Sequence, residues 1–406
     1  MKAKYDVIVV GGGAAGFFTA LNIKQYKPNT EVLILERTKE VLSKVRVSGG
    51  GRCNVTHAEF IPSELINNYP RGKKELLGPF HKFMTGDTMD WFEKQGIELK
   101  IEDDGRIFPV SDSSQTIIDC FLKLAKHYNI QILTKTPVKT ISNFNSEWTL
   151  DTPSSSFKTK SLVMATGSNT KVWDLLKKLG HHIISPVPSL FTFNCKDQRI
   201  LNLPGVVVKN VSIEVIDTSL HSEGPLLFTH WGMSAPSILK LSSFGARILN
   251  DLNYKFELKI NFINYSSVFC EEELVQNKKS QPKKNIHKRA LFDLPKRLWS
   301  ELIETSGISK ELKWADINKI QIKSLVNQLT NARFKIDGKS TFKEEFVTAG
   351  GVDLKDLDFK SFKSKKYEGL YLVGEVLNID AVTGGFNFQN AWTGAFLAAR
   401  QITSNL

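Results

Sequence analysis

The chain has 406 residues, of which 41% are hydrophobic and 24% are charged, and its mean hydropathy is -0.19. These values are typical of a globular protein with a large core, and they exclude a disordered chain, a collagen-like fibre and a small disulfide-rich scaffold. Lys and Arg outnumber Asp and Glu by 54 to 42, and this net charge of +12 favours anionic ligands or partners without identifying one.

The sequence has no segment that predicts membrane insertion or secretion. No apolar run approaches the roughly 20 residues of a membrane-spanning helix. The first residues lead directly into a strand-like run, without the features of a signal peptide. Four cysteines (Cys53, Cys120, Cys195 and Cys270) lie far apart and lack the spacing of a dithiol redox centre or a zinc ribbon. We therefore expect a cytoplasmic protein with reduced cysteines and no metal site.

The first half of the chain has the hydrophobic pattern of alternating strands and helices. The predicted elements are a strand at 6–10, a helix at 14–26, a strand at 31–35, a mixed segment at 60–96 that is helical in its second half, a helix at 115–128, and strands at 130–133 and 162–165. This alternation is typical of an α/β domain built on a parallel sheet.

The pattern changes near residue 188 and changes back near residue 341. The later elements are a β-like region at 190–262 with a helix at 236–249, helices within 270–331, strands at 347–351 and 369–373, and a helix at 387–402. We predict an α/β domain formed by 1–188 and 341–406. The insert at 189–340 is predicted to be β-rich and barrel-like over 189–265 and helical over 266–330.

One segment of the insert is strongly basic. Residues 278–289 contain six Lys and Arg and no acidic residue. Such a run is either a solvated loop between helices or a patch that binds a polyanion.

A glycine motif at the first strand–helix junction predicts dinucleotide binding. Gly11, Gly13 and Gly16 form G-x-G-x-x-G between a buried strand and a helix, and Glu36 ends the next strand. The three glycines allow, in turn, a tight turn, close approach of the backbone to a pyrophosphate, and close packing of helix and strand. The helix N-terminus then meets the phosphate charge, and the Glu36 carboxylate can accept hydrogen bonds from ribose hydroxyls.

Two later segments favour FAD over NAD as the dinucleotide. Residues 162–167 form a strand that ends in small residues, and 369–375 form a strand that runs into a Gly–Glu pair. Residues 383–387 then begin a helix whose N-terminus can stabilise the negative charge on the N1–C2=O edge of a reduced flavin. The same order of segments is found in FAD enzymes with an N-terminal dinucleotide fold.

Further segments carry a resemblance to a known family. The segments that carry this resemblance are Ser48–Asn54, Phe228–Pro236, Val347–Val352 and Gly374–Asn387. The sequence resembles the BaiN-type flavoproteins over nearly its whole length. These are NAD(P)/FAD-dependent oxidoreductases described as dehydro-bile-acid-reductase-like or aminoacetone-oxidase-like. The resemblance implies a glutathione-reductase-type FAD-binding Rossmann domain, interrupted by an insert that covers the cofactor.

The sequence departs from the family pattern near the C-terminus. The family's ending is close to Gly-Glu-x-Leu-Asp-x-Asp-Gly, and here Asn378, Asp380 and Ala381 stand in that region. The arrangement close to the flavin is therefore expected to differ in detail.

The expected cofactor site combines these segments. Gly49, Gly50 and Gly51 form a loop that can lie against a flavin or a phosphate, and Arg52 can supply a positive charge. Cys53 is either a redox thiol or, as we favour, a packed structural one. The residues expected to contact FAD are Gly11, Gly13, Ala14, Ala15, Gly16, Glu36, Arg37, Lys44, Ser48, Gly49, Gly50, Gly51, Arg52, Cys53, Asn54, Val138, Ala165, Thr166, Gly167, Gly374, Glu375, Gly384, Gly385, Phe386 and Asn387.

His230 is the candidate catalytic residue on the substrate side. It lies in a Thr-His-Trp-Gly turn of the insert, ahead of the helix predicted at 236–249. An imidazole there can act as a general acid toward a substrate, while Trp231 can pack on an apolar ligand. The alternative is a structural histidine.

These features predict an FAD-dependent oxidoreductase in which flavin N5 exchanges hydride with a small organic substrate. The family analogy favours reduction of an activated C=C bond with NAD(P)H, which would dock transiently because the sequence has no second G-x-G-x-x-G after a strand. The alternatives are an amine oxidase, an RNA-associated flavoprotein and a flavin-bound scaffold. Nucleic acid ranks below a small molecule because no basic strand with interleaved aromatic residues is found. Substrate and oligomeric state stay open.

Overall fold

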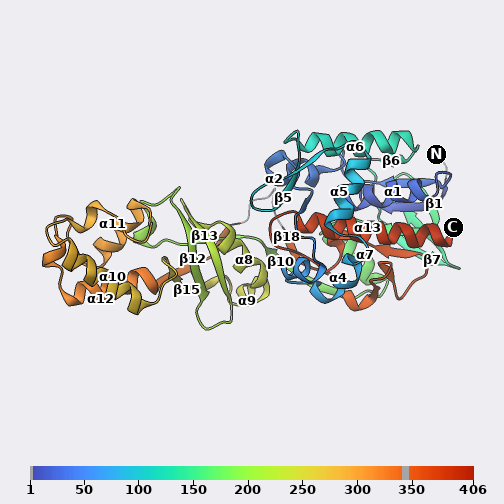
Figure 1. Ribbon diagram of the computed structural model, residues 1–406. Helices are drawn as coiled ribbons and strands as arrows, with labels where there is room; N and C mark the ends of the chain where they lie inside the picture. The colour runs from blue at the N-terminus through green and yellow to red at the C-terminus, as the bar shows by residue number, and fades with distance from the viewer. Residues whose placement is uncertain (1–2, 341–346) are drawn as a thin grey trace. The chain divides into compact units, whose positions relative to one another are not determined.

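The computed structural model describes residues 3–340 and 347–406, and Figure 1 shows its secondary structure. Contacts divide the chain into two compact units. Unit 1 comprises Met1–Val187 and Lys343–Leu406, and unit 2 comprises Pro188–Phe342. Each unit has its own cluster of buried hydrophobic residues, as expected for two domains.

Unit 1 contains a nine-stranded sheet with a parallel centre. The strand order is β19-β20-β21-β9-β1-β2-β6, and β7 and β8 continue from β9 as an antiparallel hairpin. These strands are β1 (Lys4–Val10), β2 (Val32–Leu35), β6 (Gln131–Leu133), β7 (Thr140–Phe144), β8 (Glu147–Asp151), β9 (Ser156–Met164), β19 (Leu357–Asp358), β20 (Lys363–Ser364) and β21 (Leu370–Leu372).

The centre of this sheet is covered on both faces. Val7, Ile8, Val9 and Val10 of β1 are all buried, although consecutive side chains of a strand point to opposite faces. A continuous hydrophobic run is therefore required here, as in other buried parallel strands. β1 pairs in parallel with β2 on one side and with β9 on the other.

The helices of unit 1 pack on and around this sheet. The helix α1 is buried from Ala15 to Lys24 and runs beside α13 (Figure 1). This burial explains why apolar residues are not confined to one face of the helix. The helices are α1 (Ala14–Tyr26), α2 (Ser43–Gly51), α3 (Pro62–Leu65), α4 (Lys73–Phe80), α5 (Thr85–Lys94), α6 (Ser114–His127), α7 (Thr170–Lys178) and α13 (Phe386–Asn405).

Two smaller sheets complete unit 1. One has the order β3-β5-β4, and the other pairs β10 with β18. Their strands are β3 (Thr56–His57), β4 (Leu99–Ile101), β5 (Arg106–Pro109), β10 (Ile183–Ser189) and β18 (Val347–Val352).

Unit 2 combines an antiparallel sheet with helices. The sheet has seven strands in the order β16-β15-β12-β13-β14-β11-β17, and β11 also contacts β16, so the sheet curves back on itself. The strands are β11 (Thr192–Asn194), β12 (Val207–Val215), β13 (His221–Thr229), β14 (Gly232–Ser234), β15 (Lys255–Asn261), β16 (Ala332–Asp337) and β17 (Lys339–Ser340). The helices are α8 (Pro236–Phe244), α9 (Ala246–Asp251), α10 (Ser267–Ser280), α11 (Lys296–Thr305) and α12 (Lys319–Thr330).

The predicted fold class, an FAD-type Rossmann-like domain with a barrel-like and helical insert, is confirmed. The structure adds two details. The hairpin β7–β8 was not predicted from the sequence. His230 and Trp231 form a hairpin turn between β13 and β14 instead of leading directly into a helix. None of the helices in the described ranges is long and apolar enough to cross a membrane.

Candidate functional site

The carboxyl ends of β1, β2, β9 and β21 carry 12 of the 25 predicted cofactor residues. These strands are neighbours and run parallel, so the loops that follow them meet at one edge of the sheet. The strand order changes direction at β1, because β2 lies on one side and β9 on the other. Ligands of open α/β sheets bind in the crevice at such a point.

The three glycines at the end of β1 have the geometry of a pyrophosphate loop. Gly11 has a φ of +112°, and a Cβ there would lie 2.3 Å from the carbonyl oxygen of Ala165. At Gly16 a Cβ would lie 1.9 Å from the carbonyl oxygen of Gly11. At Gly13, the N-cap of α1, a Cβ would meet no described atom within 4 Å. Gly11 and Gly16 therefore permit close packing, while Gly13 faces the space that a phosphate needs.

Glu36 lies beside this loop and holds it. Its Oε2 accepts a hydrogen bond of 2.8 Å from the backbone N–H of Gly12. Its Oε1 accepts hydrogen bonds of 2.8 Å from both the backbone N–H and the hydroxyl of Thr38. Each carboxylate oxygen has two lone pairs, so acceptor capacity remains for a ribose hydroxyl at Oε2. Glu36 thus fits both roles, loop support and ribose contact.

The ends of β9 and β21 meet next to this loop. Gly167 has a φ of +59°, and a Cβ there would lie 3.7 Å from the Glu375 carboxylate. Glu375 forms an ion pair with Lys44 of α2. Gly374 has a φ of +75° and packs against Ala15 of α1. Residues from four predicted segments therefore lie together.

The loop at the end of α2 is shaped by three consecutive glycines. Gly49, Gly50 and Gly51 have φ values of +57°, +68° and +87°, a region that other residues rarely adopt. A Cβ at Gly50 or Gly51 would meet no described atom within 4 Å. The loop therefore presents bare backbone to open space, as a surface for a planar ligand requires.

The side chains of Arg52 and Cys53, which follow this loop, pack against or bind other residues of unit 1. The Arg52 guanidinium donates to Glu102 at 2.5 Å and lies 3.9 Å from the ring centre of Phe108. Cys53 is fully buried, and burial raises the pKa of its thiol to about 12. A thiol of this kind is protonated at neutral pH and is a poor nucleophile. These contacts favour structural roles for both side chains.

The N-terminus of α13 is built from a second glycine turn. Gly384 and Gly385 have φ values of +127° and +93°, and a Cβ at Gly385 would collide with the backbone of Thr56. Asn387 fixes the preceding loop, since its Oδ1 accepts from the N–H of Ala381 at 3.0 Å. The helix has no side-chain cap, so its first N–H groups are available to a ligand.

Five buried side-chain oxygens lack a hydrogen-bond partner among the residues that the structure describes, and two of these belong to Thr85 and Asn390. The other three are Oδ1 of Asn54, Oγ1 of Thr166 and Oδ1 of Asn378. An unpaired buried oxygen is costly, and these three belong to segments predicted to contact the cofactor or to differ from the family near it. Together with the bare backbone at Gly13, Gly50 and Gly51, they fit a large polar ligand such as FAD.

The remaining predicted residues differ in their surroundings. Arg37 is exposed directly after Glu36. Val138 is half-buried and packs against the core of unit 1. It follows Thr136, whose backbone N–H donates to the Glu36 carbonyl oxygen at 2.8 Å. Both lie in segments next to Glu36, where the adenosine half of a dinucleotide is expected.

His230 lies in unit 2, in the turn between β13 and β14. Its side chain is exposed. Next to it, Trp231 is 39% exposed, and its indole N–H donates to the hydroxyl of Thr192 at 3.3 Å. A backbone hydrogen bond from the N–H of Cys195 to the carbonyl oxygen of Trp231 stabilises the turn. An exposed imidazole on a fixed turn is chemically available, so general acid catalysis by His230 stays a prediction.

Two features near α13 were not predicted from the sequence. The His57 ring stacks on Phe386 with ring centres 4.5 Å apart, and its Nδ1 lies 3.1 Å from the Gly384 carbonyl oxygen. The fully buried Asp380 forms an ion pair with Arg71, which holds the segment that departs from the family pattern. In the sequence, only the position of His57 three residues after Asn54 indicates that it lies near the predicted site.

Within the described ranges, no group of three or more His, Cys, Asp or Glu side chains could hold a metal ion.

Comparisons with known proteins cover nearly the whole chain. The family described as HI0933-like protein Rossmann domain matches residues 5–401. A ribosomal RNA dihydrouridine synthase of Haemophilus influenzae is 28% identical over 417 residues, which cover 99% of this chain and 100% of the relative. A 3-dehydro-bile acid delta(4,6)-reductase of Clostridium scindens is 23% identical and covers 97% of both chains.

Solved structures show the same fold. The 3-ketosteroid delta1-dehydrogenase of Sterolibacterium denitrificans, in complex with 1,4-androstadiene-3,17-dione, superimposes with a TM-score of 0.53 at 12% identity and covers 100% of both chains.

Proposed function

Because the chain belongs to the HI0933-like Rossmann-domain family and is an FAD-dependent oxidoreductase, we propose that it reduces an activated C=C bond, and that this bond is C5=C6 of a uridine in ribosomal RNA. The uracil double bond is conjugated to the C4 carbonyl. Hydride can therefore add to C6 while a proton adds to C5, which converts uridine to dihydrouridine. Bound reduced FAD would supply the hydride, as a two-electron donor.

The observation that carries this proposal is the full-length relative that is named a ribosomal RNA dihydrouridine synthase. The relative that is named a bile acid delta(4,6)-reductase is less similar, but its name describes the same kind of chemistry. Reduction of a double bond is thus common to both. We prefer RNA to a steroid because the more similar relative acts on RNA by name.

The charge of unit 2 supports an RNA substrate. Residues 188–342 contain 22 Lys and Arg against 15 Asp and Glu, a surplus of seven in a chain whose total surplus is twelve. A positive surface attracts the phosphate backbone and accelerates association. A steroid would gain little from such a surface.

Each unit has a separate task in this reaction. In unit 1, the N-terminus of α1 would hold the pyrophosphate of FAD and Glu36 its ribose, while the N-terminus of α13 would stabilise negative charge on the flavin. In unit 2, His230 donates the proton to C5, which is general acid catalysis. NAD(P)H would serve as the reductant of bound FAD.

The test is a single-turnover experiment with several candidate acceptors. The FAD-loaded protein is reduced without oxygen by NADH or NADPH and mixed with unmodified ribosomal RNA transcripts, a steroid enone or oxygen, while an aliphatic amine is offered to the oxidised protein. We expect rapid flavin reoxidation by the RNA and a gain of two hydrogens at one uridine by mass spectrometry. Reoxidation of the flavin by the enone alone would contradict RNA reduction and favour a small-molecule C=C reductase. Reduction of the flavin by the amine would favour an amine oxidase.

A further inference from the structure

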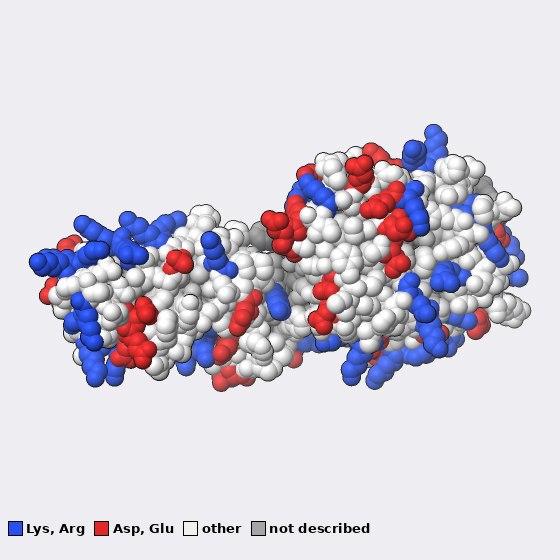
Figure 2. Space-filling view, in the orientation of Figure 1, with Lys and Arg blue, Asp and Glu red and all other residues white. Residues whose placement is uncertain are grey.

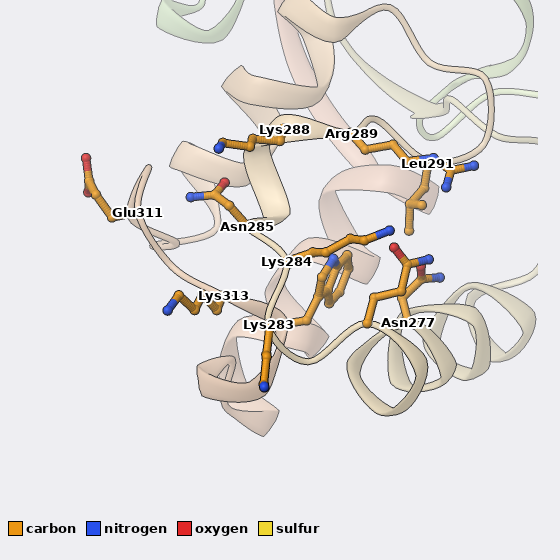
Figure 3. A pocket seen from close by; sticks show the side chains of 11 residues that line it. Asn277, Lys283, Lys284, Asn285, Lys288, Arg289, Leu291, Glu311 and Lys313 are labelled. Carbon is orange, nitrogen blue, oxygen red and sulfur yellow. The ribbon is translucent and has the colours of Figure 1, made fainter.

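Unit 2 contains a pocket whose lining is unusually cationic. It has a volume of about 430 Å³, which lies within the usual range of ligand pockets. Its lining residues are Asn277, Gln281, Lys283, Lys284, Asn285, Lys288, Arg289, Leu291, Glu311, Lys313 and Trp314. Figure 3 shows that these residues come from several segments of the helical part.

The pocket rests on a fixed backbone framework. The N–H of Trp314 donates to the carbonyl oxygen of Lys284 at 3.0 Å, and the N–H of Ile286 donates to that of Leu312 at 3.1 Å. These bonds join the basic segment to a second loop, with Trp314 buried between them. The basic run that starts in α10 is therefore held in one conformation and is not a freely solvated loop.

Five cations line this pocket: Lys283, Lys284, Lys288, Arg289 and Lys313. All five are exposed, and no ion pair within the described ranges involves them. Glu311 is the one acidic lining residue, and Figure 3 shows it at the outer edge. Figure 2 shows Lys and Arg gathered over this helical end. Uncompensated like charges repel one another, so the arrangement favours a bound polyanion.

An exposed aromatic cluster adjoins the pocket. Tyr265 and Phe269, which are 51% and 39% exposed, have ring centres 4.6 Å apart. Tyr265 also lies 6.4 Å from Phe292, and Phe292 directly follows the pocket residue Leu291. Aromatic rings of this kind are platforms on which unpaired bases stack.

We propose that this pocket binds phosphates of the RNA substrate and that neighbouring unpaired bases stack on Tyr265 and Phe269. The proposal rests on the proposed function and adds a docking site for single-stranded or looped RNA. Cations beside aromatic rings match the two surfaces of a single strand, its backbone and its bases. A flat lipid surface would not reach cations that line a concavity, so we favour RNA over a membrane.

The test compares two charge-matched variants of the FAD-loaded full chain. The pocket variant combines Lys284→Ala, Lys288→Ala and Arg289→Ala. The control combines Lys171→Ala, Lys177→Ala and Lys178→Ala, which are exposed on α7 of unit 1. Binding to a looped ribosomal RNA fragment is measured from about 50 to 300 mM salt. Flavin content and circular dichroism show that each variant is folded.

We expect the pocket variant to bind RNA more than about tenfold more weakly, since charge-assisted contacts are lost. The slope of log K against log salt should fall by about 2, because each phosphate contact on a single strand contributes about 0.7. Tyr265→Ala should weaken binding with little change in slope. The control should retain wild-type affinity and slope.

The results separate this inference from the proposed function. Equal affinity and slope in the pocket variant and the wild type would overturn the docking site, as would binding to anionic phosphatidylserine vesicles in place of RNA. Dihydrouridine formation is measured in the same samples. If the wild type forms dihydrouridine and the pocket variant binds RNA normally, the proposed function stands and only the proposed docking site is wrong. A wild type that forms none would overturn the function itself.

Discussion

Units 1 and 2 differ in how their functional residues are arranged. In unit 1 the candidate groups are backbone N–H groups and bare glycines at adjacent strand and helix ends. In unit 2 they are side chains, His230 on a hairpin turn and a cationic pocket drawn from separate segments. A cofactor shared by many enzymes is bound through backbone geometry, whereas a particular substrate is recognised through side chains. Changes in unit 1 should therefore affect the flavin, and changes in unit 2 should affect the substrate.

The largest effect is expected at the first glycine loop. Gly16→Ala would place a Cβ 1.9 Å from the Gly11 carbonyl oxygen, so strand and helix must move apart. We expect about 3 kcal/mol or more of destabilisation and loss of FAD. Gly13→Ala meets no described atom, and should keep its stability while FAD binding weakens by about 1–3 kcal/mol. Thermal unfolding and FAD titration measure the two quantities.

Gly78→Ala is the matched control, because a Cβ at Gly78 of α4 also meets no described atom. It should bind FAD like the wild type. If Gly13→Ala also bound FAD normally, the pyrophosphate would have to lie elsewhere.

The next largest effect is expected in unit 2. His230→Ala should slow reoxidation of the reduced flavin by the substrate by about 10²–10⁴-fold, the usual contribution of general acid–base catalysis. FAD content and reduction by NAD(P)H should be unchanged. Stopped-flow absorbance measures both half-reactions. His221→Ala, at another exposed histidine on β13, should behave like the wild type, and equal rates for both variants would exclude His230 as the proton donor.

A smaller effect is expected at Glu36. Glu36→Ala removes hydrogen bonds to a charged group, so FAD binding should weaken by about 1.5–3 kcal/mol, with substrate preference unchanged. The loss of support for Gly12 N–H contributes to this value. Glu40→Ala, at an exposed position nearby, serves as the control. An unchanged FAD dissociation constant for a folded Glu36→Ala protein would mean that the ribose lies elsewhere.

The smallest effect concerns a histidine in the core of unit 1. Burial lowers the pKa of His181 below its usual 6.5, and Asp356 opposes this shift. As the pH falls, His181 is therefore protonated in the unfolded chain at a higher pH than in the folded chain. The free energy of unfolding should decrease as the pH falls below about 6.5. His181→Gln should flatten this dependence without changing the flavin half-reactions. Urea unfolding between pH 5 and 8 measures it, and an unchanged slope in the variant would assign the dependence to other groups.

The sequence predicted much of unit 1 because glycines encode backbone geometry directly. Gly11, Gly13 and Gly16 can be interpreted locally, and the helix at 14–26 has the predicted bounds. The hairpin β7–β8 was missed because its first strand is mostly exposed and its turn uses Asn145 and Ser146 at positive φ in place of glycine.

Contacts between distant segments could not be predicted in the same way. Arg52 is predicted to supply a charge to the cofactor, and its stacking on Phe108 depends on how β5 packs. The basic and aromatic residues of unit 2 are not interleaved in the sequence, and only the folded chain brings Tyr265 next to Phe292. For this reason the sequence pattern alone favours a small molecule over RNA.

The most direct test of the proposed reaction, and of the separate roles of units 1 and 2, is the content of dihydrouridine in ribosomal RNA from cells that lack the gene. Complementation with the wild type should restore one dihydrouridine, as measured by mass spectrometry of RNA fragments. Gly16→Ala and His230→Ala should restore less of it for different reasons, the first without bound FAD and the second with it. Ribosomal RNA with the same dihydrouridine content in the presence and absence of the gene would contradict the proposed reaction.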